Sequence, residues 1–98
     1  MGKYAVMYED VRQDKDNLSP DLLNGHVEHL RGLYSQGKVL MYGTLESNGY
    51  YRGKGLLIFE AASQEEVESY ILADPFIIRK WYAGYHIYKW DEVAATIF

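Results

Sequence analysis

Lys54–Pro75, with the sequence KGLLIFEAASQEEVESYILADP, is the stretch that decides the fold. It starts with an apolar run that ends at Glu60 and is typical of a β-strand. Ser63, followed three residues later by Glu66, is a capping box of the kind that begins a helix. The proline at the end of the stretch pushes Asp74 out of helical geometry. The stretch therefore predicts a strand connected directly to a helix, with Asp74 as the last helical residue.

Residues 39–45 (VLMYGTL) predict a hairpin partner for this strand, because the intervening residues 46–53 are rich in turn-forming serine, asparagine and glycine. Before them, residues 21–36 carry apolar side chains at intervals of three and four, as on one face of a helix. Ser19 can cap the start of this helix, and Gly37 can supply the left-handed residue that ends it. The central part of the chain is thus predicted as helix, strand, strand, helix.

Two further strands complete the pattern, at residues 3–8 (KYAVMY) and 85–90 (YHIYKW). Residues 9–20 predict a polar loop, and residues 76–82 predict a short irregular or single-turn segment. The order βαββαβ defines a ferredoxin-like fold of the α+β class. Rules for chain connections then predict an antiparallel four-stranded sheet in the order 4-1-3-2, with two helices on one face. We expect one domain over residues 1–98.

Three of the predicted strands are apolar on both of their faces. The runs are AVM at residues 5–7, VLM at residues 39–41 and LLIF at residues 56–59. An antiparallel sheet with one face in water should instead alternate apolar and polar residues. Two helices can cover only one face, and a large exposed apolar patch is rare on a soluble monomer. We therefore predict a homodimer in which two copies pack through their sheets.

Composition excludes several classes of function. The formal net charge is −4, and the basic residues are scattered, so nothing in the sequence favours binding to nucleic acid. The chain has no cysteine, which excludes disulfides, thiolate catalysis and cysteine metal sites. No stretch approaches the roughly 20 apolar residues that a membrane span needs. We expect a cytoplasmic protein that does not associate with membranes.

The predicted topology brings His26 and Asp74 together, although they lie far apart in the sequence. His26 lies near the start of the first helix and Asp74 at the end of the second, and both ends fall at the same end of the sheet. The first two predicted strands and the segment after Asp74 bring further residues to this end: Tyr8, Gly43, Thr44 and Phe76. A carboxylate beside an imidazole fixes its tautomer, as a general base near neutral pH requires. Alternatively, His26 packs at the edge of the core and Asp74 merely ends a helix.

Other chemical constellations are weaker. His26 and His29 lie three residues apart on one helical face, and a zinc ion would need a third ligand such as Asp74 or Glu28. His86 lies in a predicted strand, and its side chain is expected to project from one face of the sheet. The glycines around the predicted hairpin do not open a helix and so form no nucleotide-binding pattern. We predict no bound metal and no cofactor.

The sequence resembles the YciI-like family over about residues 3–90. His26 precedes a helix that ends at a glycine and a strand that reaches Gly43, as in the family pattern. The most specific part of the resemblance is Ala-Asp-Pro-Phe at residues 73–76, followed by a closing strand. The resemblance implies a dimeric α+β barrel with a His–Asp active site, which here falls on His26 and Asp74. One relative in this family is known as a dehydrochlorinase of hydroxylated chloroaromatic compounds.

The chain departs from the family pattern at two places. Family members often carry an arginine one turn before the histidine, where this chain has Leu23. The usual Gly-Pro after the second strand is replaced by Gly43 and Thr44. Both differences leave the class of substrate open.

Together these features predict a cofactor-independent enzyme of the lyase or isomerase type, which acts on a small cyclic or aromatic molecule. His26 would be the general base and Asp74 its orienting partner. The pocket would be lined by the remaining residues at this end: Tyr8, Gly43, Thr44 and Phe76. The alternatives are a module that binds or senses a small molecule without catalysis, and a cofactor-free monooxygenase.

Overall fold

The computed structural model describes residues 1–11 and 18–91 of the chain. Its elements follow in the order β1 (Gly2–Val11), α1 (Pro20–Ser35), β2 (Val39–Ser47), β3 (Tyr50–Ala61), α2 (Gln64–Leu72), α3 (Pro75–Ile78) and β4 (Tyr82–Trp90). The predicted order βαββαβ is confirmed, and α3 is the short turn that was expected within the segment before the last strand. The final residues, 92–98, and the part of the predicted loop at residues 12–17 lie outside the described residues.

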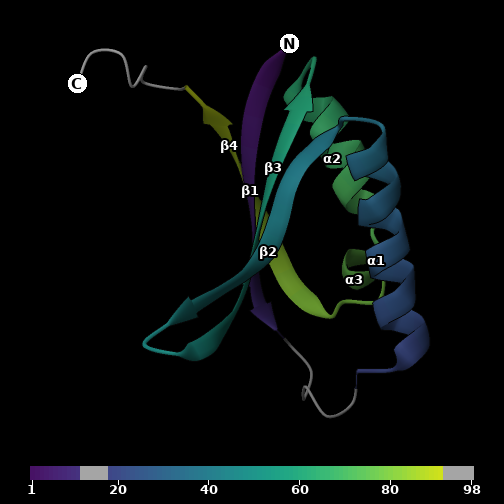
Figure 1. Ribbon diagram of the computed structural model, residues 1–98, viewed down its shortest axis with the longest axis vertical. Helices are drawn as coiled ribbons and strands as arrows, with labels where there is room; N and C mark the ends of the chain where they lie inside the picture. Colours follow the sequence, from purple (N-terminus) through teal and green to yellow (C-terminus); the bar gives the residue numbers. More distant parts are fainter. Residues whose placement is uncertain (12–17, 92–98) are drawn as a thin grey trace.

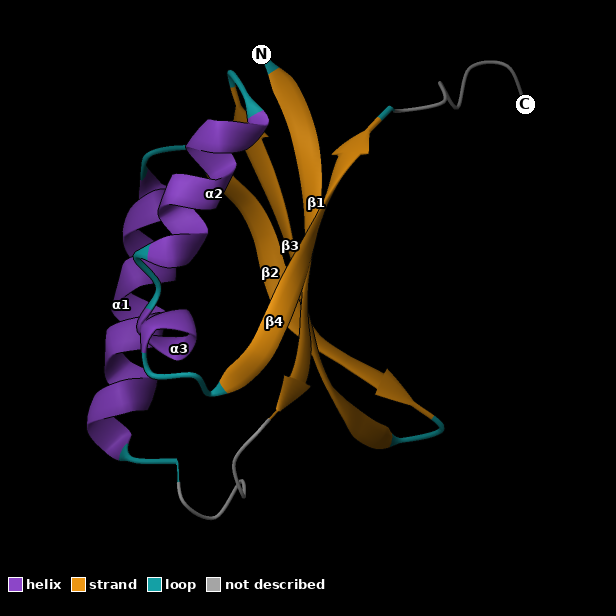
Figure 2. Ribbon diagram, turned by 180° about the vertical axis from the view of Figure 1, so that it is seen from behind, coloured by secondary structure: helices purple, strands orange, loops and turns teal. Residues whose placement is uncertain are grey.

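The four strands form one antiparallel sheet in the order β2-β3-β1-β4, as the sequence predicts. The helices all lie against the same face of this sheet (Figures 1 and 2). Strand β1 is central and pairs with β3 on one side and β4 on the other. In the β1–β3 pairing, Tyr4 lies opposite Phe59 and Tyr8 opposite Gly55. The fold is therefore the predicted ferredoxin-like arrangement of the α+β class.

The β2–β3 hairpin is longer than the sequence predicts. Its turn consists only of Asn48 and Gly49, with φ values of 55° and 79°, which match the tight two-residue turns preferred in hairpins. The prediction of a turn over residues 46–53 was therefore too wide, because the ladder continues to the two residues that flank the turn. The register shifts between Thr44 and Glu46, and such a bulge bends a strand. Beyond it the hairpin curves away from the helices (Figure 1).

The predicted caps hold the helices in place. The Ser19 hydroxyl accepts a backbone N–H of α1 at 3.1 Å, and Gly37 has the left-handed φ of 74° that ends this helix. The Ser63 hydroxyl accepts the backbone N–H of Glu66 at 3.2 Å at the start of α2. The Glu66 carboxylate in turn accepts the backbone N–H of Ala62 at 2.8 Å, one residue earlier than in a standard capping box. Both helix starts were thus recognisable from the sequence.

The prediction that Asp74 is the last residue of α2 was wrong. Helix α2 ends at Leu72, and Asp74 is the N-cap of the short helix α3. The proline rule identified the break in the helix correctly, since the Asp74 backbone is extended, with φ −73° and ψ 124°. However, Pro75 also suits the first position of a helix, so the same dipeptide starts the next turn. This change of role turns the Asp74 carboxylate toward the start of α3.

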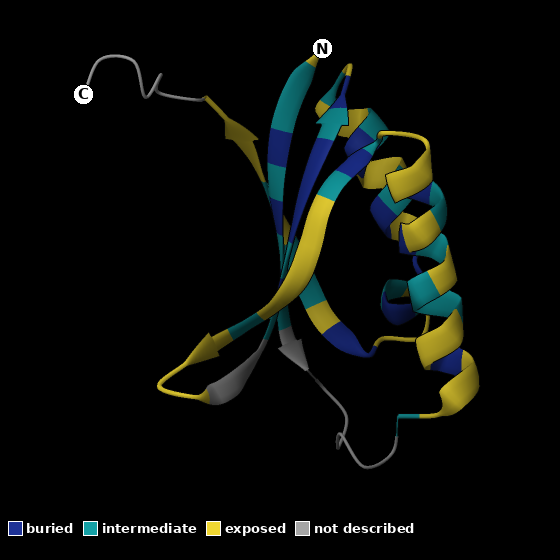
Figure 3. Cartoon of the chain, viewed as in Figure 1, coloured by how far each residue is buried: buried dark blue, intermediate teal, exposed yellow. Residues whose placement is uncertain are grey.

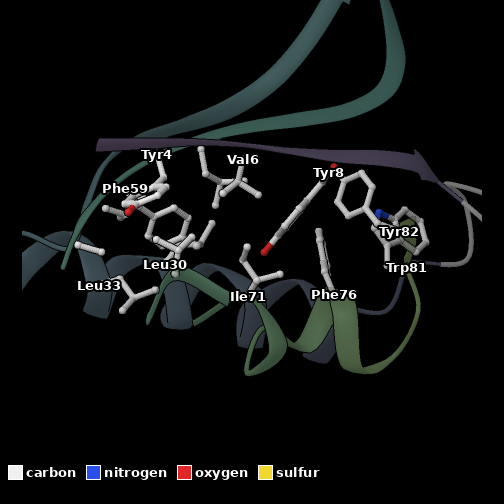
Figure 4. Packing of buried hydrophobic residues seen from close by; sticks show 14 of the residues in the cluster. Tyr4, Val6, Tyr8, Leu30, Leu33, Phe59, Ile71, Phe76, Trp81 and Tyr82 are labelled. Atoms are coloured by element: carbon white, nitrogen blue, oxygen red, sulfur yellow. The ribbon is translucent and has the colours of Figure 1, made fainter. Parts of the chain in front are cut away.

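The space between the helices and the sheet holds the hydrophobic core (Figures 3 and 4). Toward one end of this layer, which we call the closed end, lie Tyr4, Leu33, Val39 and Phe59. Toward the other, which we call the cavity end, lie Tyr8, Phe76, Trp81 and Tyr82, and Figure 4 shows how these rings gather. All eight side chains are buried. The two ends share β1 and the helical layer but differ in what they enclose.

The opposite face of the sheet is not covered by any helix among the described residues, and it carries apolar side chains across its middle. Met41, Ile58, Ala5 and Tyr88 form a row across all four strands, since each is the register partner of the next. Within this row Met41 is 61% exposed and Tyr88 53% exposed, and Trp90 nearby is also exposed. The row agrees with the prediction of a sheet that is apolar on both faces. None of the helices among the described residues is long and apolar enough to cross a membrane.

Candidate active site

Asp74 is a charged side chain that is completely buried, with an exposed fraction of 0%. Its Oδ1 accepts the backbone N–H of Phe76 at 2.9 Å, which is the N-cap hydrogen bond of α3. A buried carboxylate is costly unless its oxygens accept hydrogen bonds or pair with a cation. Among the described residues, no buried side-chain nitrogen or oxygen lacks a partner. The donors around Asp74 therefore account for how this charge is tolerated in the core.

His26 provides a second partner for the carboxylate. Its Nδ1 lies 2.8 Å from Oδ1 and 3.0 Å from Oδ2 of Asp74, so the two residues lie together as topology predicts. An ionised carboxylate can only accept hydrogen bonds, so Nδ1 carries the proton. The imidazole also stacks on the ring of Phe76, with centroids 3.8 Å apart and planes at 3°. These two contacts fix the ring and leave Nε2 as the nitrogen that Asp74 does not use.

Tyr8 provides the third partner. Its hydroxyl donates to Oδ2 of Asp74 at 2.7 Å, in the core of the protein. Burial, reinforced by the negative charge of Asp74 and by this hydrogen bond, raises the pKa of Tyr8 far above its ordinary value of 10.0. The phenol is therefore neutral over the whole physiological pH range and acts as a hydrogen-bond donor.

A cavity of about 330 Å³ opens beside this network. Its walls are mostly apolar and come from every layer of the fold: Tyr8, Leu18, Leu23, His26, Leu30, Tyr42, Gly43, Thr44, Gly55, Leu57, Phe76, Trp81 and Tyr82. His26 belongs to this wall and Asp74 does not, so the imidazole is the member of the pair that borders the cavity. Pockets of this kind, apolar with few convergent polar groups, are typical of small-molecule sites.

The local structure explains why the cavity forms here. Thr44 lies opposite Gly55 in the β2–β3 ladder, so both belong to the face of the sheet that the helices cover. A Cβ atom at Gly55 would lie 3.3 Å from the Tyr82 hydroxyl and 3.8 Å from the Cβ of Tyr8. The glycine therefore leaves room for two tyrosines beside the cavity.

The structure gathers the four residues predicted to line a pocket, because Tyr8, Gly43, Thr44 and Phe76 all belong to the cavity wall. Their role in binding stays a prediction. Sequence reasoning missed other wall residues: Leu18, Leu23, Leu30, Tyr42, Gly55, Leu57, Trp81 and Tyr82. The signal for the last two was present, since the segment after Asp74 was placed at this end. Which of its side chains turn inward depends on α3, which the sequence did not resolve.

The structure gives the other histidines different environments. The Nε2 of His29 lies 2.8 Å from the carbonyl oxygen of Tyr70, so this ring links α1 to α2. His86 lies on the uncovered face of the sheet, with its Nε2 3.0 Å from Glu9. Within residues 1–11 and 18–91, no three His, Cys, Asp or Glu side chains are grouped to hold a metal ion. The alternative of a zinc site on His26 and His29 therefore finds no third ligand among these residues.

The fold and site together define a small ferredoxin-like α+β protein with a carboxylate–imidazole pair at an apolar cavity. The model of the YCII-related domain matches residues 3–91, so the chain belongs to the YCII-related family. This confirms the family resemblance that the sequence motifs indicate. No curated protein matches the chain.

Two solved structures resemble the chain in fold. One is 5-chloro-2-hydroxyhydroquinone dehydrochlorinase from Burkholderia phenoliruptrix, in complex with 2,5-dihydroxybenzoquinone. It is 23% identical, with a TM-score of 0.73, and the match covers 92% of this chain and 95% of the other. The second is an Arabidopsis thaliana protein, 15% identical with a TM-score of 0.52, where the match covers 97% and 98% of the two chains. At these identities the likeness establishes the shared fold.

Proposed function

We propose that this protein is a cofactor-independent acid/base enzyme of the lyase or isomerase type. The observation that carries the proposal is the position of His26, whose Nδ1 is held by the buried Asp74 while its ring forms part of the cavity wall. In this arrangement Nε2 is the general base. Asp74 orients the ring and stabilises the imidazolium that forms when Nε2 takes a proton.

The cavity favours a small cyclic or aromatic substrate. Rings of Tyr8, Tyr42, Phe76, Trp81 and Tyr82 belong to its wall, and aromatic faces and edges pack well against a planar ligand. The structural relative named as a 5-chloro-2-hydroxyhydroquinone dehydrochlorinase binds a ligand of this class. We therefore propose a hydroxylated ring compound, and we choose 5-chloro-2-hydroxyhydroquinone as the first substrate to test.

A dehydrochlorination would use the site in a simple sequence. One ring hydroxyl first loses its proton and becomes a carbonyl while the chlorine-bearing carbon takes up a proton and becomes tetrahedral. Nε2 of His26 then takes the proton of a second ring hydroxyl, and the electron pair of that O–H bond forms a second carbonyl. The ring electrons displaced in this step expel chloride from the tetrahedral carbon, so the net loss is one proton and one chloride ion. The imidazolium then returns its proton to solvent, while Nδ1 stays hydrogen-bonded to Asp74. Positioned acid/base groups of this kind typically contribute about 10²–10⁴-fold to a rate.

Chloride release from 5-chloro-2-hydroxyhydroquinone, with His26→Asn and His29→Gln as matched variants, tests this function. Asparagine places an amide donor near the position of Nδ1 and can keep the bond to Asp74, but it has no counterpart of Nε2. Glutamine likewise can keep the contact of His29 with the Tyr70 carbonyl. We expect turnover by the wild type and His29→Gln only. Binding of 2,5-dihydroxybenzoquinone without turnover of the chlorinated compound would instead indicate a binding module.

We also propose that two copies pair through the uncovered face of the sheet. The support is the apolar row across the four strands, in which the large side chains of Met41 and Tyr88 are exposed. Large apolar side chains exposed on one face of a sheet often mark an interaction surface, and Ile58 between them is 3% exposed. Light scattering coupled to size exclusion should give a dimer mass for the wild type and a monomer mass for Met41→Glu combined with Tyr88→Glu. A monomeric wild type would contradict the pairing.

A further inference from the structure

We propose that the Tyr8 hydroxyl is a positioning group, which holds Asp74 in the orientation that keeps the His26 ring ready to act as a base. This inference rests on the proposed function and assigns Tyr8 a second role. The Tyr8 ring belongs to the cavity wall, but its hydroxyl donates to Asp74 at 2.7 Å. The hydroxyl is thus directed to the carboxylate behind His26.

The geometry of the carboxylate shows what the hydroxyl contributes. The backbone N–H of Phe76 holds Oδ1 at 2.9 Å, and His26 Nδ1 approaches both oxygens, at 2.8 and 3.0 Å. Tyr8 is the donor that holds Oδ2 from the side of the sheet. With Phe76 and Tyr8 each fixing one oxygen, rotation about the Cβ–Cγ bond of Asp74 is blocked. Without the hydroxyl, only Oδ1 has a fixed donor other than the histidine itself.

Tyr8 is rigidly placed because it lies on a strand that is paired on both sides. Strand β1 lies inside the sheet and pairs with β3 and β4, and Tyr8 itself has register partners on both sides, Gly55 and Tyr85. Sites built on paired strands are more exactly placed than sites on loops. Asp74, in contrast, lies in the short connection between α2 and α3. The hydroxyl therefore ties a residue of a connecting segment to the central strand.

The protonation of Tyr8 suits this role. Because burial and the neighbouring carboxylate raise the pKa of Tyr8, the phenol keeps its proton at every pH at which the protein would work. Its proton is donated to Oδ2 of Asp74, so we assign the hydroxyl no proton transfer with a substrate. Its contribution lies in the placement of Asp74, and through Asp74 in the placement of the imidazole.

Tyr8→Phe tests the proposal, and Tyr4→Phe is the matched control. Tyr4 lies on the same strand and faces the same layer, but it belongs to the closed end of the core. The first readout is the NMR resonance of the His26 Nδ1 proton. We expect Tyr8→Phe to shift and broaden it, while Tyr4→Phe leaves it unchanged. The second readout is chloride release from 5-chloro-2-hydroxyhydroquinone, where Tyr8→Phe should lower kcat about 10- to 100-fold with little change in KM.

The two readouts separate the two proposals. If the wild type releases no chloride, the proposed function fails for this substrate. The NMR comparison alone then decides whether Tyr8 positions Asp74 and His26. An unchanged Nδ1 proton in a folded Tyr8→Phe variant overturns the positioning role, even if the wild type is active. If Tyr8→Phe does not fold, an NMR measurement on the wild-type protein tests the inference instead. A cross-peak between the Tyr8 hydroxyl proton and the His26 Nδ1 proton is expected, and its absence overturns the inference.

Discussion

The two ends of the layer between the helices and the sheet share α1, β1, β2 and β3, but they enclose different things. At the closed end Tyr4 lies opposite Phe59, and the large side chains of the two strands fill the space. At the cavity end Tyr8 lies opposite Gly55, and β2 bends away after Thr44. The space that Phe59 fills opposite Tyr4 is thus left open beside Gly55, opposite Tyr8.

The two histidines of α1 show the same contrast on a smaller scale. At the cavity end, His26 hydrogen-bonds to a buried carboxylate and forms part of the cavity wall. One helical turn further, His29 hydrogen-bonds to the carbonyl oxygen of Tyr70 through its Nε2. A backbone carbonyl needs a donor, so the nitrogen that would act as a base in His29 already carries the proton. The difference lies in the hydrogen-bond partner that each ring has.

The largest expected effect separates these two histidines by activity. His26→Asn should lower turnover of 5-chloro-2-hydroxyhydroquinone by about 10²–10⁴-fold, because the variant lacks the nitrogen that takes the proton. His29→Gln should retain turnover close to that of the wild type. Chloride release under saturating substrate measures both. Equal activities in the two variants would show that His26 has no catalytic role that His29 lacks.

The second prediction compares the stability lost when each of two N-caps is removed, Asp74 of α3 and Ser63 of α2. Asp74→Ala should lower the free energy of unfolding by about 3–5 kcal/mol, because it leaves buried donors and the imidazole without their partner. Ser63→Ala removes an N-cap from α2 in a more exposed position and should cost about 1 kcal/mol. Urea unfolding followed by circular dichroism measures both values. Similar losses for the two variants would show that Asp74 acts only as a helix cap.

The third prediction compares two glycines. Gly55→Ala should destabilise the protein by about 1–3 kcal/mol, since its Cβ would lie 3.3 Å from the Tyr82 hydroxyl in a packed wall. Gly32→Ala, in α1, meets no atom within 4 Å and should stabilise the protein by about 0.5–1 kcal/mol through helix propensity. Thermal unfolding gives the sign of each change. A stabilising Gly55→Ala would mean that the wall has spare room.

The smallest expected effect is a pH dependence at the start of α2. Hydrogen bonds from the Tyr70 hydroxyl and the Ala62 backbone N–H lower the pKa of Glu66 below its ordinary value of 4.5. A carboxyl with a lowered pKa in the folded state stabilises the protein above its unfolded pKa, and this contribution disappears as the pH falls through the folded value. Glu66→Gln should therefore be less stable than the wild type near neutral pH. The difference should shrink below about pH 4, as unfolding curves at each pH would show.

Much of this architecture was predictable from local sequence signals. Ser19, Gly37 and the capping box at Ser63 fixed the helix starts and one helix end, because caps depend on residues only a few positions apart. The order of the elements then fixed the sheet, since connection rules allow few topologies. The meeting of His26 and Asp74 followed from that topology without any knowledge of side-chain positions.

The details that make the site depended on packing that no local pattern records. The sequence placed Asp74 at the end of α2, whereas it caps α3 and thereby turns its carboxylate into the core. The hydrogen bond from Tyr8 joins residues that are distant in the chain, and its geometry depends on the register of β1 in the sheet. A short turn was expected before the last strand, but the burial of Trp81 after α3 could not be derived from it. Such long-range contacts are decided by the whole fold.

The tautomers of His26 and His29 provide the most direct test of the account, because they require no substrate. Two-bond ¹⁵N–¹H correlation spectra at about pH 8, where a free imidazole is neutral, report which ring nitrogen carries the proton. The account predicts opposite tautomers, with the proton on Nδ1 in His26 and on Nε2 in His29. In Asp74→Asn, the His26 signals alone should change. A proton on Nε2 of His26 in the wild type would contradict the account, because the nitrogen left for the cavity would then be a donor and no base.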